Sequence, residues 1–175
     1  MPLVQFDLTQ CPLPDDFADV TVLLNVLEHV PDHEAAVRHL FRITRPGGAV
    51  IIEVRAGSSL FDVFDRALMH CRRYDMAALV ALFERAGFTI ARKSHLGFFL
   101  YPAFYLSKRL NQLRYRRPGA ISDQEIAAQM IAGTRKRNAL GSFAMGMEEA
   151  LRPFLPYPKG VRCLITAVKP LGGKQ

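Results

Sequence analysis

The sequence has few cysteines and none of the spacings that cysteine-based sites need. Cys11, Cys71 and Cys163 are an odd number and lie far apart in the chain. No C-x-x-C pair occurs among them, which argues against both a zinc site and a disulfide framework. We therefore expect no metal centre and a reducing compartment, namely the cytoplasm.

Long apolar runs are also missing. The most apolar stretch, Leu96 to Leu106, is interrupted by Pro102 and has about half of the roughly 20 residues that a membrane-spanning helix needs. The chain does not open with a basic segment followed by an apolar core, so we expect no secretory signal. The sequence therefore predicts no segment that crosses a membrane.

Acidic residues are outnumbered, and the formal net charge is +7. Many of the basic residues fall in one region: Lys108, Arg109, Arg114, Arg116, Arg117, Arg135, Lys136 and Arg137. No RNA- or DNA-binding motif accompanies them, so we do not expect a nucleic-acid partner. With 175 residues, half of them apolar, the chain is long enough for one domain with a buried core.

A strand, a helix and a second strand are predicted between Ala18 and Val54. Short apolar runs at Val20 to Leu24 and Ala49 to Val54 are typical of buried strands. Between them a helical apolar pattern begins after Pro31 and Asp32 and is expected to stop at Pro46 to Gly48. These three elements form a right-handed βαβ unit in a parallel sheet.

The carboxyl end of the first strand is the expected position of the site. In sheets of this kind ligands bind outside the carboxyl ends of the strands, and this end carries the residues Asn25 to His29. On spacing alone, a strand-to-helix turn without any function explains the same residues equally well.

The amino-acid sequences of three segments resemble those of a known family. NVLEHV at 25–30, RITRPGGAVIIEV at 42–54 and HCRRYDMAALVALFERAGF at 70–88 resemble class I S-adenosylmethionine-dependent methyltransferases, especially those that act on quinones, lipids and other small molecules. The resemblance covers about Phe6 to Phe88. It implies an α/β fold with an incomplete Rossmann-like sheet, whose strands are the fourth to seventh of the family plan with the last antiparallel.

The resemblance also implies which residues hold S-adenosylmethionine. Asp7 matches the residue that meets the adenine amino group, and Leu8 lies next to it against the ring. Asn25, Val26 and Leu27 follow the strand that carries the site. An ordinary loop aspartate is the alternative for Asp7.

The family's glycine-rich loop does not occur in this sequence. Gly47 and Gly48 follow a helix, and Gly172 and Gly173 lie near the end. Each charge-assisted hydrogen bond that such a loop makes contributes about 1.5 to 3 kcal/mol. We therefore expect weak cofactor binding and doubtful activity from this chain alone, as in a truncated methyltransferase domain.

The acceptor side of the site is expected to carry His29, His70, Arg73 and Tyr74. His29 is either a general base or a residue that shapes the pocket. The segment from His70 to Tyr74 matches the family's H-x-R-R-Y phrase, in which the arginine offers a bidentate contact to an anion. A helix entry with solvated arginines is the alternative interpretation of that segment.

The remaining elements are predicted from capping and periodicity. Asp75 is expected to cap a helix that ends at Gly87, and strands are expected at Phe88 to Ala91 and Val161 to Val168. The loop from Ala56 to Cys71 is expected to form a lid over the site. We expect one partial domain over residues 1–170 and a flexible tail at 171–175.

A helical insertion is expected over residues 97–152 of that domain. Its predicted helices are Ala103 to Arg114, Asp123 to Ala132 and Phe143 to Leu151. The aromatic and basic residues 98–117 have the composition of an interfacial membrane element or of the mouth of a lipid pocket. A core helix with a solvated basic end is the alternative.

Two classes of function follow. The first is methyl transfer from S-adenosylmethionine to a small acceptor, apolar or lipid-like. The second is a non-catalytic remnant or interaction module, peripheral to a membrane through residues 98–117. Because the family places a further strand beside Val20 to Leu24, we also expect self-association or a partner chain at that edge.

Overall fold

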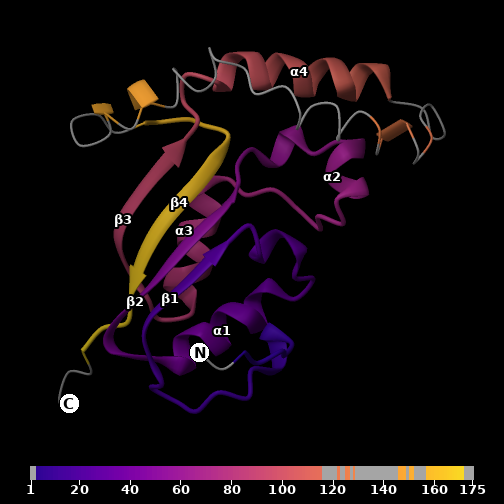
Figure 1. The fold of residues 1–175 in the computed structure, drawn as a ribbon. Helices are drawn as coiled ribbons and strands as arrows, with labels where there is room; N and C mark the ends of the chain where they lie inside the picture. Colours follow the sequence, from indigo (N-terminus) through magenta and orange to yellow (C-terminus); the bar gives the residue numbers. More distant parts are fainter. Residues whose placement is uncertain are drawn as a thin grey trace.

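The computed structural model describes residues 3–115 and 157–171, together with residues 122, 125, 126, 128, 146–148, 150 and 151. Its centre is a sheet in the order β1-β2-β4-β3. The strands are β1 (Ala18–Leu24), β2 (Thr44–Arg55), β3 (Thr89–Leu96) and β4 (Arg162–Val168). β1 and β2 are parallel, and β4 is antiparallel to both of its neighbours (Figure 1). The predicted α/β class and the antiparallel last strand are confirmed.

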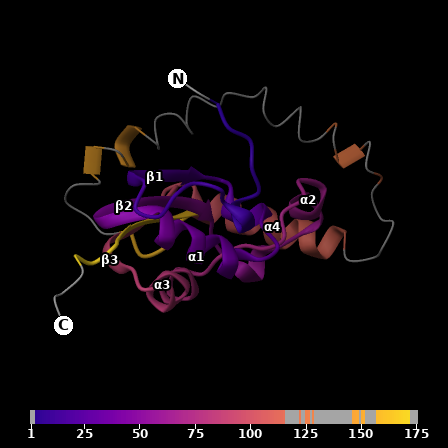
Figure 2. The ribbon, with the colours of Figure 1, turned by 90° about the horizontal axis from the view of Figure 1, so that it is seen from below.

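Two helices cover one face of the sheet. α1 (His33–Ile43) and α3 (Met76–Arg85) lie together on the same side, as Figure 2 shows. Two further helices, the short α2 (Val63–Ala67) and the longer α4 (Tyr101–Arg114), lie beyond the strand ends (Figure 1). Single turns of 3-10 helix occupy η1 (Leu8–Gln10), η2 (Leu27–His29) and η3 (Ser58–Leu60).

The core lies between the sheet and these two helices. Alternate residues of β2 and β4 point into it because side chains of a strand alternate between the two faces. The apolar positions predicted for the two helices are buried there. The buried residues are Val50, Ile52, Val54, Cys163, Ile165 and Ala167 of the sheet, Ala36, Val37, Leu40 and Ile43 of α1, and Leu79, Leu82 and Phe83 of α3.

Helix α1 begins as predicted and ends earlier. The Asp32 carboxylate accepts a hydrogen bond from the Ala35 amide at 2.8 Å, which caps the first turn. The predicted stop at Pro46 to Gly48 is wrong. Thr44 ends the helix, because its backbone is already extended and its hydroxyl donates to the Leu40 carbonyl at 2.6 Å.

The residues expected to end the helix instead form an irregularity in β2. Ala18 pairs with Thr44 and Val20 pairs with Ala49, so β2 bulges between these pairs. Gly48 sits at the closest approach, where a Cβ atom would lie 2.9 Å from the Asp19 carbonyl oxygen. Only glycine fits this crossing without moving the backbone.

Strand β1 differs from its predicted burial. The run Val20 to Leu24 was expected to be a buried strand, yet only Leu23 is buried. Val20, Val22 and Leu24 are each more than half exposed, at 57%, 54% and 53%. They lie on the face opposite α1 and α3, and no described helix packs against that face. β1 is also an edge strand, as the sequence predicted for the isolated segment.

The later elements are close to their predicted bounds. β4 matches Val161 to Val168 within one residue, whereas β3 continues to Leu96, well beyond the predicted Ala91. Asp75 occupies the N-cap position of α3 but makes no capping bond, because its carboxylate accepts from the Ser58 amide at 3.1 Å and from the Ser58 hydroxyl.

The first predicted helix of the insertion is confirmed as α4. The predictions for 123–132 and 143–151 fall largely outside the described residues, as does the tail at 172–175. Within the described part, Ser122 accepts a hydrogen bond from the Glu125 amide at 3.3 Å, as a helix cap does. No helix in that part is long and apolar enough to cross a bilayer.

Candidate functional site

The chain leaves β1 through a left-handed residue. Asn25 has φ of 54°, and its amide donates to the Glu53 carbonyl of β2 at 2.9 Å. Asparagine tolerates this conformation better than most residues. The reversal turns the next residues back over the strand end as η2, with Leu27 and Glu28 fully buried and Val26 and His29 exposed.

The H-x-R-R-Y segment is hydrogen-bonded to this turn. The Cys71 amide donates to the Glu28 carbonyl at 2.8 Å. The Arg72 guanidinium donates to the carbonyls of Val30 and Pro31 at 3.1 and 2.7 Å. Two predicted parts of the site, more than 40 residues apart at these contacts, therefore form one unit at the carboxyl end of β1.

His29 and His70 are brought together by this arrangement. Their rings lie edge to face with centroids 4.6 Å apart. His29 is exposed, and its Nδ1 lies 3.3 Å from the Met69 carbonyl oxygen. His70 is buried with Nδ1 3.3 Å from the Asp65 carboxylate, and this burial lowers the pKa of His70. His29 is thus the exposed member of the pair and the one within reach of a ligand.

Arg73 makes a bidentate contact, but inside the chain. Its Nε and Nη2 atoms donate to the two oxygens of Asp65 at 2.9 and 2.7 Å, and Nη1 donates to the Ala56 carbonyl at 3.0 Å. The side chain is almost fully buried. The alternative of a solvated arginine is therefore wrong for Arg73, while its role at an acceptor stays a prediction.

Asp65 is the centre of a buried ionic network. Lys108 of α4 donates to Asp65 at 3.0 Å and to Asp62 at 2.8 Å. Burial alone would raise the pKa of Asp65, but hydrogen bonds and charges from Arg73 and Lys108 hold it well below its usual range. The Phe104 ring lies beneath both cations, 5.4 Å from Arg73 and 5.8 Å from Lys108. The network joins α4 to the segment that follows β2.

Tyr74 is a buried residue at the base of the site. Its hydroxyl donates to the Leu27 carbonyl at 3.3 Å and lies 2.8 Å from His33 Nδ1. Burial raises the pKa of Tyr74 to about 12. Tyr74 also lines a hollow of about 140 Å³ at the ends of β2 and β3, together with Met76 and His95.

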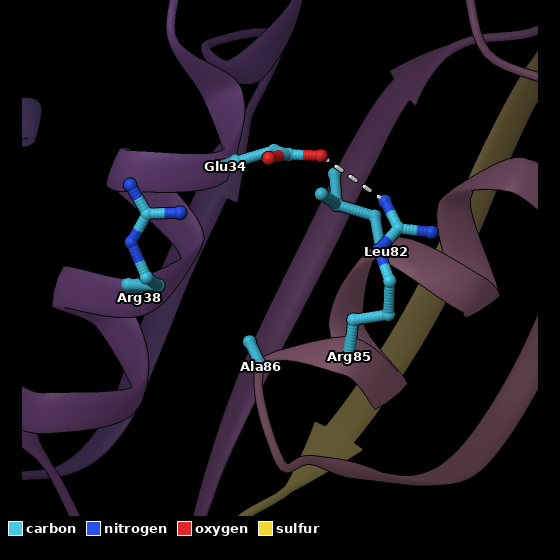
Figure 3. A pocket seen from close by; sticks show the side chains of 5 residues that line it. All are labelled: Glu34, Arg38, Leu82, Arg85 and Ala86. Carbon is cyan, nitrogen blue, oxygen red and sulfur yellow. Dashed lines mark hydrogen bonds and ion pairs between the residues drawn. The ribbon is translucent and has the colours of Figure 1, made fainter.

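A second and larger hollow adjoins the first at Met76 and His95. It has a volume of about 370 Å³, and its lining consists of Met76, Lys93, Ser94, His95, Tyr157 and Pro158. A third, of about 80 Å³, lies between α1 and α3, where Glu34 and Arg85 pair at 3.3 Å (Figure 3). That third hollow contains no residue of the predicted site.

Three polar side chains at the strand ends were missed or only partly assigned by sequence reasoning. Asn25 Oδ1, both Glu28 carboxylate oxygens and Arg55 Nε are buried without a hydrogen-bond partner. Glu28 and Arg55 were not expected to act. The available signal for Glu28 was a carboxylate within the apolar run NVLEHV. Buried polar atoms without partners are rare in proteins, and each needs a partner such as a bound water, an ion or a ligand.

The predicted adenine-binding residues, Asp7 and Leu8, lie in the segment that precedes β1. Asp7 is exposed and caps η1, accepting from the Thr9 amide at 2.8 Å and the Thr9 hydroxyl at 2.7 Å. These hydrogen bonds lower the pKa of Asp7, so the side chain is an anion over a wide pH range. Leu8 packs against the core beside α1.

The fold is that of a class I methyltransferase, and the comparisons agree. Residues 1–93 match the model of the methyltransferase domain family. The match covers more than half of the chain, which therefore belongs to this family. S-adenosylmethionine is the cofactor that this membership brings.

Individual relatives point the same way. A probable S-adenosylmethionine-dependent methyltransferase of Mycolicibacterium smegmatis is 35% identical over 86 residues, which are 48% of this chain and 34% of that protein. The ubiquinone/menaquinone biosynthesis C-methyltransferase UbiE of Vibrio campbellii is 37% identical over 49 residues, 28% of this chain and 19% of that protein. The chain thus spans about a third or less of these relatives' length.

A solved structure shares the fold along almost the whole chain. The YcgJ protein of Bacillus subtilis matches with a TM-score of 0.55 and 17% identity, covering 97% of this chain and 71% of that one. Similarity at this level of identity shows the fold alone. It confirms the Rossmann-like arrangement that the family resemblance predicted.

The strand-end residues fit one part of the cofactor. The methionine end of S-adenosylmethionine carries an ammonium group, which only donates hydrogen bonds, and Asn25 Oδ1 and the Glu28 carboxylate are buried acceptors without a partner. These two acceptor groups suit a cation, whereas Arg55 Nε, at the end of the neighbouring strand, is a donor. The position matches the rule that ligands bind at the carboxyl ends of the strands.

Proposed function

We propose that this chain carries part of a site for S-adenosylmethionine-dependent methyl transfer to a small molecule, with residues for both the cofactor and the methyl acceptor. The observation that carries the proposal is the group of unpartnered buried acceptors, Asn25 and Glu28, where β1 ends. Family membership supports the reaction class. Bound there, S-adenosylmethionine supplies a methyl group activated by a positively charged sulfur.

The residues of the chain have distinct tasks in this proposal. Asn25 and Glu28 accept hydrogen bonds from the cofactor's amino group, while Val26 and Leu27 shape the strand end beside it. Asp7 accepts from the adenine amino group, and Leu8 lies against the ring. Each of these tasks holds one end of the cofactor so that the reacting atoms are aligned.

On the acceptor side, His29 is positioned to hold or take a proton. It is exposed, unlike its neighbour His70, whose Nδ1 lies beside Asp65. His70, Arg73 and Tyr74 act through position, because their polar atoms contact other parts of the chain. Alignment supplies most of the rate enhancement in such a site, and proton removal by His29 adds to it.

The acceptor class that suits the hollows of this chain is apolar or lipid-like. The larger hollow lies beside β3, at the edge of the sheet opposite β1. Its walls are mostly apolar and include Met76, Tyr157 and Pro158, and Lys93 also lines it. UbiE, whose name describes quinone biosynthesis, is among the relatives. The combination of apolar walls and a nearby cation suits a hydrophobic molecule with one polar or anionic end.

A second candidate function rests on the open face of the sheet. Val20, Val22 and Leu24 present apolar side chains on an edge strand. A non-catalytic interaction module would use this face to bind another polypeptide. The two functions differ in one measurable property, because only the first requires affinity for the cofactor.

Calorimetry with S-adenosylhomocysteine tests the first function. We expect weak binding by this chain, in the high micromolar range or above. Asn25→Gly keeps the left-handed backbone and removes the side-chain amide. It should therefore weaken cofactor binding about tenfold, the effect of one charge-assisted hydrogen bond. Glu28→Gln should also weaken binding, because it removes the negative charge from the acceptor group.

Glu34→Gln is the matched control for Glu28→Gln. Glu34 is an exposed glutamate, the second residue of α1, and it pairs with Arg85 in the hollow between α1 and α3. Binding should not change in this variant. Equal affinity of the wild type, Asn25→Gly and Glu28→Gln would refute the proposed cofactor position, and nanomolar binding would contradict the expected weakness.

A further inference from the structure

Helix α4 buries a charged side chain and exposes apolar ones, which is the reverse of an ordinary surface helix. Lys108 is among the described buried residues of the chain, with 8% of its surface exposed. Leu106, Leu110 and Leu113 of the same helix are 59%, 55% and 69% exposed. A charged side chain points inward and three leucines point outward, whereas the hydrophobic effect alone favours the opposite.

Specific polar contacts hold the inward side of α4. The Lys108 ammonium group lies between Asp62 and Asp65, and Gln112 donates to the carbonyls of Ser59 and Phe61 at 2.8 and 3.0 Å. Lys108 and Gln112 are one turn apart and so lie on one side of the helix. These contacts fix the rotation of α4 about its axis.

The fixed rotation places the leucines in a continuous outer stripe. Leu106, Leu110 and Leu113 follow the spacing i, i+4, i+7, which lines one face of a helix. Lys108 and Leu110 are two residues apart, which is about 200° around the helix. Figure 1 shows α4 beyond the strand ends. Because Lys108 faces Asp62 and Asp65 and the three leucines are exposed, the stripe lies on the side of α4 away from these carboxylates.

Basic residues border the stripe, and acidic residues are absent from this part of the sequence. Arg109 lies on one flank, held by Tyr105 and Gln112 at 3.1 Å each, and exposed Arg114 lies on the other. No acidic residue occurs between Glu84 and Asp123. An apolar stripe between arginines suits a surface that is apolar inside and negatively charged at its boundary.

We propose that the outer face of α4 binds the surface of an anionic lipid membrane, with Leu106, Leu110 and Leu113 inserted among the acyl chains and the flanking arginines at the head groups. The Lys108 contacts then keep the strand-end site at a fixed height above the lipid. The membrane contact does not depend on methyl transfer, but it would present a lipid-like acceptor to that site.

Flotation of the chain with vesicles of phosphatidylcholine, with and without phosphatidylglycerol, tests the proposal. We expect binding to the anionic vesicles at low salt and release as salt screens the arginines. The triple variant Leu106→Ser, Leu110→Ser, Leu113→Ser should lower the partition coefficient by at least about a hundredfold, because three large apolar groups no longer leave water.

The matched control removes three apolar side chains of similar exposure elsewhere. It is Leu3→Ser, Val4→Ser, Leu171→Ser, whose residues are 100%, 59% and 76% exposed, and it should bind like the wild type. Because all six residues are exposed, both variants should keep the wild-type melting temperature. Equal loss in both variants, or no binding to anionic vesicles, would overturn the proposal.

Two further outcomes separate this proposal from its neighbours. If light scattering shows a dimer that the α4 triple variant dissociates, and vesicles do not bind, the stripe is an interface between two copies and the membrane proposal is wrong. Cofactor affinity is measured independently by calorimetry. If the α4 triple variant loses vesicle binding and keeps its cofactor affinity, then α4, and not the strand-end site, is the element that binds the membrane.

Discussion

The two faces of the sheet differ in how completely they are covered. On one face, Val50, Ile52 and Val54 are fully buried beneath α1 and α3. On the other, Val20, Val22 and Leu24 of the neighbouring strand are more than half exposed. Both faces carry large apolar side chains, since Ile51 of β2 lies beside Val22 on the open face, so the presence of apolar residues does not explain the difference. Coverage does, because the described helices that pack on the sheet lie on one side (Figure 2).

The comparison teaches which parts of the fold are self-sufficient. A sheet with helices on one face has one core, and a parallel sheet normally has both faces covered. The uncovered face here ends in an edge strand whose outward backbone groups are available for pairing. The stability of the described fold must therefore come mainly from the covered face, and the open face is the one left available to a further element.

The largest effect should come from truncation on the covered face. Leu40 is fully buried in α1, and Leu40→Ala should lower the free energy of unfolding by about 2–5 kcal/mol, through lost burial and a residual cavity. Urea denaturation followed by circular dichroism measures this change.

Val22→Ala is the corresponding truncation on the open face. Because Val22 is more than half exposed, its loss should change the free energy of unfolding by less than about 1 kcal/mol. A large effect for Val22→Ala would mean that this face is covered when the protein folds, and the comparison between the faces would no longer hold.

The covered face is also the part that the sequence predicted best. The helical spacing of Ala36, Val37 and Leu40 and of Leu79, Leu82 and Phe83 reports burial directly, and the structure places all of them in the core. The bulge at Gly48 was not predictable in the same way. Whether two glycines end a helix or cross a neighbouring strand depends on the partner strand, which local sequence does not specify.

An intermediate effect is expected from acid, and it should be confined to one region. Burial lowers the pKa of His70, so the folded protein resists the proton that the unfolded chain accepts near 6.5. Stability should therefore be complete above that pH and fall below it. Asp65, whose pKa is also lowered, adds stability above 3.8 that is lost as the pH falls further.

Hydrogen exchange at successive pH values measures where the loss occurs. Protection should fall first in α2 and α4, which the network around Asp65 joins, and later in β1. His70→Gln should remove part of the upper step. Burial also lowers the pKa of His33, and a nearby charge on Arg72 adds to this, so His33→Gln serves as the comparison variant for the remainder. Uniform loss across the chain would show that the network is not a separate unit.

The candidate site was predictable in position but not in the partners of its residues. The resemblance to the family's sequence motifs predicted that His29, His70, Arg73 and Tyr74 lie at the same strand end, and the structure has them there. Their contacts were less accessible, because Arg73 binds Asp65 and Lys108 arrives from α4, 43 residues further along the chain from Asp65. A salt bridge between distant elements leaves no local pattern. Glu28 was overlooked for a related reason, since its burial depends on the turn after Asn25.

The smallest effect on stability, and the most direct test of the open face, is expected from Val22→Lys. Because the side chain is 54% exposed, the lysine should change the free energy of unfolding by about 0.5 kcal/mol or less. It places a charge in the middle of the apolar edge, which is how natural edge strands avoid pairing. If the wild type self-associates through β1, light scattering should show the variant as a monomer at the same concentration. Glu34→Gln, which raises the net charge by the same one unit on the covered side, should leave association unchanged, and a wild-type chain that stays monomeric would exclude β1 as a self-interface.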